Sequence, residues 1–226
     1  LPLAKLEELY KEATAESKEN PQIAQACHEC LVKLQQGDKE LVEIWGKVVR
    51  VSMTEVYRIY GQLDVKLKPE DECGESFYNN MLAETVEVMR KAGVLEESEG
   101  ALCIFLDEFK TKEGKPLPII VQKSDGGYNY ATFDLAAMRH RTQTLKGDRI
   151  IYVTDARQAL HFKQIFAASK HAKILPNVDV KLEHVTFGSI LGEDNKPLKT
   201  RSGENVKLAD LLKEAVDKAY NVVNEK

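Results

Sequence analysis

The sequence predicts an α/β protein built on a parallel sheet, and two observations support this class. Apolar residues recur at helical spacing through the first quarter of the chain, whereas after residue 126 short strand-like apolar runs alternate with helical patterns. Such alternation indicates parallel strands joined by crossover helices, and ligands of these sheets bind at the carboxyl ends of the strands. With 43% hydrophobic and 30% charged residues, the 226-residue chain is long enough to bury a sizeable core in one large domain or two small ones.

Residues 1–62 are expected to form a helical segment of two or three helices. The apolar spacing is interrupted at Asn20-Pro21 and again at Gln36-Gly37-Asp38. Asp38 is placed as the N-cap of a last helix that runs from about Lys39 to Gly61.

The stretch Cys27-His28-Glu29-Cys30 has the spacing of half a metal site. Structural zinc needs four ligands, and no second pair at matching spacing is present. Cys27 and Cys30 lie on the apolar stripe of their helix, so burial in a core is the favoured interpretation and no metal site is predicted. Four cysteines are also too few for a disulfide framework, and we expect them to be reduced.

Residues 63–125 form a second, mixed α+β part in this interpretation, and residues 126–226 form a third. Alternation, turn residues and helical spacing define their elements. The middle part is expected to contain a strand at Leu63–Leu67, a helix from about Tyr78 to Lys91 that Gly93 ends, and strands at Ala101–Leu106 and Pro118–Gln122 around the turn Lys110–Gly114. The last part is expected to contain strands at Tyr128–Thr132, Arg149–Thr154 and Val180–Phe187, and helices at Asp134–Thr144, Ala156–His171 and Val206–Val223.

The stretch from Asp125 to Arg141 is the candidate binding pocket. Asp125-Gly126-Gly127 predicts a hairpin turn, and Tyr130 and Asp134 are four residues apart, so they share a face if the chain is helical between them. A carboxylate near a helix start, beside an aromatic ring, is able to receive a cation. Ordinary strand tyrosines have the same spacing, so the spacing alone leaves the function open.

A second polar group follows the predicted strand Arg149–Thr154. Asp155 is placed as a helix N-cap, while Gln158 and His161 are three residues apart and share a helical face at the carboxyl end of that strand. This position supports two interpretations about equally: Gln158 and His161 bind a ligand, or His161 is an ordinary core histidine whose hydrogen bonds are made within the protein.

Phosphate recognition has one candidate, the stretch Gly192–Gly203. Neither G-x-G-x-x-G nor G-x-x-x-x-G-K-[ST] occurs in the sequence. The stretch carries three cations, Lys196, Lys199 and Arg201, between two glycines and just before a predicted helix. A solvated surface loop has the same composition and is the favoured interpretation in isolation.

Charge and hydropathy restrict the classes of partner. With 32 Lys+Arg against 36 Asp+Glu and a net charge of −4, the chain has no overall basic field, so any RNA contact must come from a local patch. One such patch contains Arg139, His140, Arg141, Lys146 and Arg149, for which a solvated face is favoured. The longest apolar run is too short to span a bilayer and no signal-like stretch opens the chain, so a soluble, cytoplasmic protein is expected.

Taken together, these stretches resemble the catalytic domain of arginyl-tRNA synthetases, which are class I aminoacyl-tRNA synthetases. The resemblance runs over nearly the whole chain, as several blocks in the right order. The blocks are Val32–Asp38 with Trp45, Gly74–Asn79, Glu97–Ala101, Phe105–Lys110, Asp125–Thr132 with Asp134, Asp155–His161, and Phe187-Gly188 through Val206–Asp210. The resemblance implies that the parallel sheet is the second half of a Rossmann-like nucleotide-binding fold, with residues 1–62 as its helical segment and residues 63–125 as an inserted part that contains the hairpin.

The activity implied by the resemblance is ATP-dependent activation of L-arginine to arginyl-adenylate and transfer to the cognate tRNA, with Mg²⁺ accompanying ATP. A guanidinium is a planar fork of donors that a carboxylate binds through two parallel hydrogen bonds, and the family pattern gives Asp134 this role. By the same pattern Tyr130 flanks the guanidinium, and Glu75 and Gln158 bind the amino-acid end or help to close the pocket. His161 is expected to line the pocket near the nucleotide.

The remaining roles implied by the resemblance concern ATP. Backbone groups at Phe187-Gly188 would hold adenine, and Lys196, Lys199 or Arg201 would stabilise the departing pyrophosphate. The stretch Pro197–Arg201 is a degenerate form of the signature Lys-Met-Ser-Lys-Ser, so which cation assists stays open.

The class signature His-x-Gly-His does not occur among the five histidines. We therefore expect this chain to be the central fragment of a monomeric arginine–tRNA ligase and to be inactive alone. The alternatives are a non-catalytic nucleotide- or arginine-binding regulatory module with the same fold, and a different class I synthetase, which would not need an acid for a guanidinium.

Overall fold

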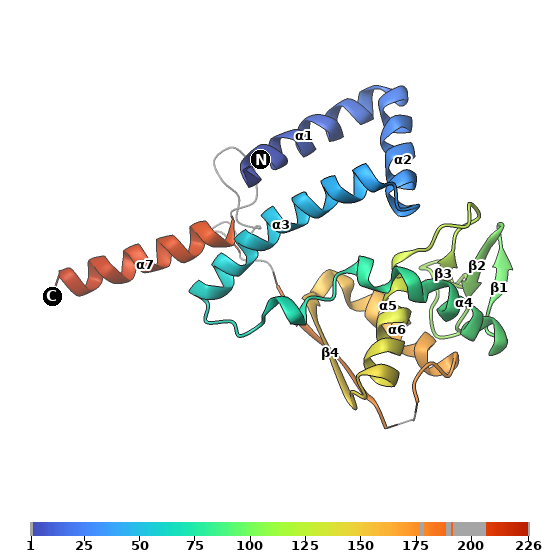
Figure 1. Ribbon diagram of the computed structural model, residues 1–226. Coiled ribbons are helices and arrows are strands. Elements are labelled where there is room, and N and C mark those ends of the chain that lie inside the picture. The colour runs from blue at the N-terminus through green and yellow to red at the C-terminus, as the bar shows by residue number, and fades with distance from the viewer. Residues whose placement is uncertain (1, 177–178, 189–190, 192–206, 226) are drawn as a thin grey trace. The chain divides into compact units, whose positions relative to one another are not determined.

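The computed structural model describes residues 2–176, 179–188, 191 and 207–225, and the chain divides into two compact units, Leu1–Asp71 and Glu72–Lys226. The first unit consists of three helices, in which α2 joins α1 to α3 (Figure 1), followed by a short 3₁₀ turn. These elements are α1 (Leu3–Glu19), α2 (Pro21–Gln35), α3 (Lys39–Gln62) and η1 (Pro69–Asp71). The Asn20 side chain accepts a hydrogen bond from the Gln22 amide and the Asp38 side chain one from the Leu41 amide, which confirms both predicted helix breaks.

The helices of the first unit bury little apolar surface. None of the described residues from Pro2 to Asp71 is buried, and Trp45 is 41% exposed. The prediction that Cys27 and Cys30 lie in a core is therefore wrong, because both are exposed. The apolar stripe of α2 exists, but the described helices of this unit cover it only in part.

The second unit begins with a helix and a small antiparallel sheet. Its elements are η2 (Glu75–Met81, a 3₁₀ helix), α4 (Leu82–Lys91), β1 (Glu96–Ser98), β2 (Ala101–Ile104) and β3 (Ile119–Gln122), with the strands paired in the order β1-β2-β3. Gly93 follows α4 at a φ of +70°, as the predicted helix end requires. Glu99 and Gly100 both have positive φ in the two-residue turn between β1 and β2, which suits the right-handed twist of a hairpin. The predicted hairpin strands are confirmed, whereas β1 was not predicted.

The remainder of the unit contains the parallel sheet. Its elements are α5 (Tyr130–Arg139), η3 (His140–Thr144, a π-helical turn), β4 (Arg149–Asp155), η4 (Ala156–Gln158, a 3₁₀ turn), α6 (Ala159–His171), β5 (Lys181–Phe187) and α7 (Leu208–Asn224). Strands β4 and β5 are parallel, in register from Arg149 opposite Lys181 to Asp155 opposite Phe187. The α6 helix connects them, so the prediction of a parallel sheet with a crossover helix is confirmed.

Two predicted strands are wrong. Residues 63–67 are not a strand, because the end of α3 continues into a tight turn in which Asp64 has a φ of +54° and the Val65 amide donates to the Tyr60 carbonyl. Residues 128–132 are not a strand either: Tyr128 makes one bridge with Gln122, and α5 begins at Tyr130.

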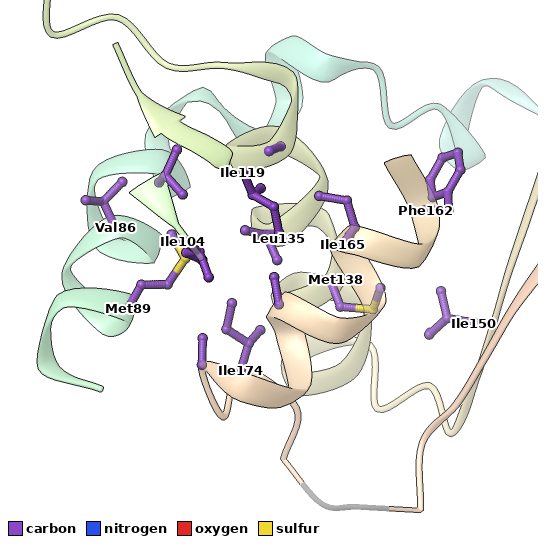
Figure 2. Close-up of a cluster of buried hydrophobic side chains, with 14 of the residues drawn as sticks. Val86, Met89, Ile104, Ile119, Leu135, Met138, Ile150, Phe162, Ile165 and Ile174 are labelled. Atoms are coloured by element: carbon purple, nitrogen blue, oxygen red, sulfur yellow. The ribbon is translucent and has the colours of Figure 1, made fainter. Parts of the chain in front are cut away.

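The core of the second unit joins both sheets through α5 and α6. Figure 2 shows side chains from α4, β2, β3, α5, β4 and α6 meeting in one cluster. Leu135 and Met138 of α5, Ile165 of α6 and Ile104 of β2 are each 0% exposed. This packing fixes the backbones of α5 and α6 against each other, and these are the two helices that carry the central residues of the candidate site.

Candidate functional site

The start of α5 is fixed by three hydrogen bonds that also position the candidate pocket. The Asn129 side chain accepts from the Tyr130 amide at 2.9 Å, and the Thr132 amide donates to the Asn129 carbonyl at 2.9 Å. The buried Thr132 hydroxyl donates to the Val121 carbonyl of β3. Tyr130 is therefore the first residue of a helix, and Asp134, one turn later, lies on the same side, as the spacing predicts.

Asp134 and His161 meet across the α5–α6 interface. The distance from His161 Nε2 to Asp134 Oδ2 is 2.6 Å, and the side chains are 33% and 27% exposed, respectively. An ionised carboxylate only accepts hydrogen bonds, so against such a carboxylate Nε2 is the donor and Oδ2 the acceptor. Tyr130 is 69% exposed, so its ring is open to a ligand beside this carboxylate.

Arg141 and Tyr152 complete the surroundings of Asp134. The guanidinium of Arg141 lies over the Tyr152 ring, 5.1 Å from its centroid. Burial lowers the pKa of Arg141, but Tyr152, Tyr78 and the Asp134 charge outweigh this and the net shift is upward. Burial raises the pKa of Tyr152 to about 12, with Arg141 opposing the shift and Asp134 adding to it. The Tyr152 hydroxyl is buried, and no described residue lies within hydrogen-bond geometry of it.

Sequence reasoning missed Arg141 and Tyr152 as neighbours of Asp134. Asp134 and Arg141 are seven residues apart, which is two helical turns, so the spacing contained a signal for one of them. The π-helical turn at His140–Thr144 that carries Arg141 has no comparable signal, and such turns are frequent at functional sites.

The carboxyl ends of β4 and β5 carry the second predicted group of residues. The Asp155 side chain accepts hydrogen bonds from the Arg157 amide and guanidinium, which confirms the predicted N-cap and lowers the pKa of Asp155. Gln158 is exposed at the end of η4. Phe187, 54% exposed, is paired with Asp155 at the end of β5, and a side chain built at the following Gly188 would meet nothing within 4 Å. An open backbone next to an exposed ring at this edge is compatible with a flat aromatic ligand.

The structure does not bring every predicted residue to this group. Glu75 begins η2, which packs against α5, but its side chain is exposed and no contact joins it to Asp134 or Tyr130 among the described residues. Lys196, Lys199 and Arg201 lie outside the residues that the structure describes.

The basic patch at the end of α5 is largely engaged within the chain. Arg139 pairs with Glu84, and Arg149 makes two hydrogen bonds of 2.8 Å to Glu183. Since Arg141 is held over Tyr152, three of these cations already have partners within the chain, so the patch is not the simple solvated face that the sequence favoured.

Within the described ranges, no group of three or more His, Cys, Asp or Glu side chains is placed to hold a metal ion, and no helix is long and apolar enough to cross a membrane. A cavity of about 290 Å³ lies beside the hairpin, lined mainly by the Phe105–Lys110 stretch, and no predicted site residue lines it.

A parallel sheet with a crossover helix, and with polar residues at the carboxyl ends of its strands, is the arrangement in which α/β folds bind their ligands. The chain belongs to the class I tRNA synthetase family described as "tRNA synthetases class I (R), catalytic domain", whose family model matches residues 1–226.

Named relatives are arginine–tRNA ligases. The chain is 48% identical to the arginine–tRNA ligase of Stutzerimonas stutzeri over 224 residues, which cover 99% of the chain and 38% of that relative. It is 51% identical to the arginine–tRNA ligase of Crocosphaera subtropica over 219 residues, covering 97% of the chain and 37% of that relative. The chain thus spans well under half the length of the curated relatives that it matches.

Solved structures agree with this assignment. The crystal structure of arginyl-tRNA synthetase from Plasmodium falciparum matches with a TM-score of 0.74 and 31% identity, covering 91% of this chain and 32% of that one. The Thermus thermophilus arginyl-tRNA synthetase matches with a TM-score of 0.63 over 92% of this chain and 38% of that one, and at 17% identity this match shows the fold alone.

Proposed function

We propose that the chain forms part of an enzyme that ligates L-arginine to its tRNA through arginyl-adenylate, using ATP. The observation that carries this proposal is the carboxylate of Asp134. His161 occupies Oδ2, Oδ1 has no hydrogen-bond partner among the described residues, and the exposed Tyr130 ring lies one turn before it. A partly exposed carboxylate beside an open aromatic ring suits a planar guanidinium, which donates two parallel hydrogen bonds and stacks on aromatic faces.

In this proposal Asp134 binds the guanidinium and Tyr130 forms an aromatic wall beside it. Gln158 and Glu75 contact the amino-acid end of arginine or help to close the pocket. The exposure of both side chains supports such a role, because neither is committed to an internal contact with the other site residues among the described residues.

The nucleotide half of the site is proposed at the ends of the parallel strands. Phe187 and Gly188 hold adenine through backbone groups, which the open space at Gly188 supports. One of the cations Lys196, Lys199 and Arg201 stabilises the leaving pyrophosphate. Mg²⁺ accompanies ATP, and no described residue is assigned to it.

We further propose a division into a helical segment (1–62), an inserted part (63–125) and the second half of the nucleotide-binding fold (126–226). The partner is the arginine-accepting tRNA, the protein is a cytoplasmic monomer, and the relatives named arginine–tRNA ligase support the choice of tRNA.

The test is Asp134→Asn in the longest natural form of the protein that contains this chain, measured by tRNA-supported, arginine-dependent pyrophosphate exchange. The amide keeps the size but loses the charge and one acceptor, so we expect the KM for arginine to rise about 100-fold, as the loss of a charge-assisted pair implies. Asp148→Asn is the matched control, because Asp148 is exposed outside the site, and it should leave the KM unchanged.

Near-normal arginine affinity in Asp134→Asn would sink the assignment of the pocket. Calorimetry separates the rival proposal of a regulatory module: arginine or ATP would bind the unsubstituted protein, but no pyrophosphate exchange would accompany the binding.

A further inference from the structure

We propose that His161 is a positioning residue for the Asp134 carboxylate that binds arginine: its Nε2–H fixes the plane of this carboxylate so that Oδ1 and the open side of Oδ2 face the guanidinium. This inference rests on the proposed function. It moves His161 from the nucleotide half of the site, where the family resemblance led us to expect it, to the arginine half.

The contact itself has the geometry of a strong hydrogen bond. The Nε2–Oδ2 distance of 2.6 Å is slightly shorter than is usual for a nitrogen donor and a charged oxygen acceptor. Both side chains are about one-third exposed or less, which leaves the pair accessible to a ligand from one side and supported by protein from the other.

The His161 ring is held in place by the core. It meets the Phe162 ring edge-on at 5.1 Å, and Phe162 is 5% exposed and lies 4.6 Å from the Tyr152 ring. Leu135 and Ile165 belong to one buried cluster that packs α5 against α6. The donor His161 and the acceptor Asp134 are therefore carried by two packed helices rather than by loops.

A carboxylate whose plane is fixed binds a guanidinium more favourably than one that is free to rotate. Two parallel hydrogen bonds form only when both oxygens lie in the plane of the donor fork, and an unrestrained aspartate rotates about its last torsion. A hydrogen bond to one oxygen removes this freedom before the ligand arrives, so less entropy is lost on binding. Among the described residues Asp134 makes no hydrogen bond other than the one from His161.

The test compares His161→Leu with His161→Gln in the longest natural form of the protein, with pyrophosphate exchange as the readout. Glutamine places an N–H at about the reach of Nε2, whereas leucine offers no donor. We expect His161→Leu to raise the KM for arginine about ten-fold, the size of one hydrogen bond to a charged group, and to leave the KM for ATP and the melting temperature close to those of the unsubstituted protein. His161→Gln should recover most of the arginine affinity.

A double-mutant cycle shows whether His161 acts through Asp134. In the Asp134→Asn background, His161→Leu should add less than about a two-fold further change, because contacting residues that act as a unit are not additive. His161→Ala replaces the leucine variant if the latter gives no folded protein.

The inference is overturned if His161→Leu raises the KM for ATP and leaves that for arginine unchanged, if leucine and glutamine impair arginine binding equally, or if the effects in the cycle simply add. These outcomes leave the proposed function intact as long as Asp134→Asn still lowers the affinity for arginine. Absence of arginine-dependent exchange in the unsubstituted protein would instead refute the proposed function.

Discussion

The two units use amphipathic helices in opposite ways. In the second unit, α5 buries Leu135 and Met138 completely, and every buried residue of the described chain belongs to this unit. In the first unit, α3 has apolar residues at regular helical spacing, yet Ile44 and Val48 are 48% and 37% exposed. The comparison teaches that apolar spacing identifies the apolar face of an amphipathic helix but does not determine whether other parts of this chain bury that face.

This difference determines where the stability of the described chain resides. Hydrophobic burial is the main favourable contribution to folding, so the second unit should account for most of the free energy of unfolding. The same burial anchors the helix that carries the candidate site: Asp134 directly precedes the fully buried Leu135, and the buried Thr132 hydroxyl donates a hydrogen bond to the Val121 carbonyl of β3.

The comparison is tested most strongly at Leu135. Replacing it with alanine in the 226-residue chain removes apolar contacts and leaves a cavity between α5 and its neighbours, so the free energy of unfolding should fall by about 3–5 kcal/mol. Urea denaturation followed by far-ultraviolet circular dichroism measures this change. A loss below about 1 kcal/mol would show that the core of the second unit is not the principal source of stability.

A smaller effect is expected at Tyr152, the other buried neighbour of the site. Its folded pKa of about 12 lies above the ordinary value of 10.0, so the folded state retains the phenol proton while the unfolded state loses it. Stability should therefore fall as pH rises from 10 to 12, by about 2 kcal/mol from this group alone. Because its hydroxyl has no hydrogen-bond partner among the described residues, Tyr152→Phe should change stability at pH 8 by less than about 1 kcal/mol.

The measurement is the difference in unfolding free energy between the two proteins across the alkaline range, which cancels the titration of lysines and other tyrosines. The decline between pH 10 and 12 should be shallower in Tyr152→Phe. Equal slopes would mean that Tyr152 is not buried in the folded state as described.

Local chemistry explains which parts of the fold were predictable. The breaks at Asn20 and Asp38 and the turn at Asp125–Gly127 were found because capping and turn residues act within a few positions of themselves. The strand expected at residues 128–132 failed because Thr132 bonds to the Val121 carbonyl, eleven residues away, and thereby stabilises a helix start. The burial expected for Cys27 and Cys30 failed because spacing describes one helix only.

The candidate site divides in the same manner. The shared face of Tyr130 and Asp134 follows from a four-residue spacing within one helix. The hydrogen bond between Asp134 and His161 spans 27 positions and depends on how α6 packs against α5, which no local pattern determines. Family resemblance led us to expect both residues in one pocket but gave no geometry for their contact.

The smallest change in stability is expected for a leucine-to-alanine substitution in the first unit, which serves as the control for Leu135→Ala. Leu31 in α2 is 51% exposed, so Leu31→Ala removes the same atoms as Leu135→Ala but creates no enclosed cavity. The free energy of unfolding of the 226-residue chain should change by less than about 0.5 kcal/mol, as for surface substitutions. The same denaturation experiment measures it. A loss approaching that of Leu135→Ala would mean that the helices of the first unit bury their apolar stripes in solution, and the contrast between the two units would fail.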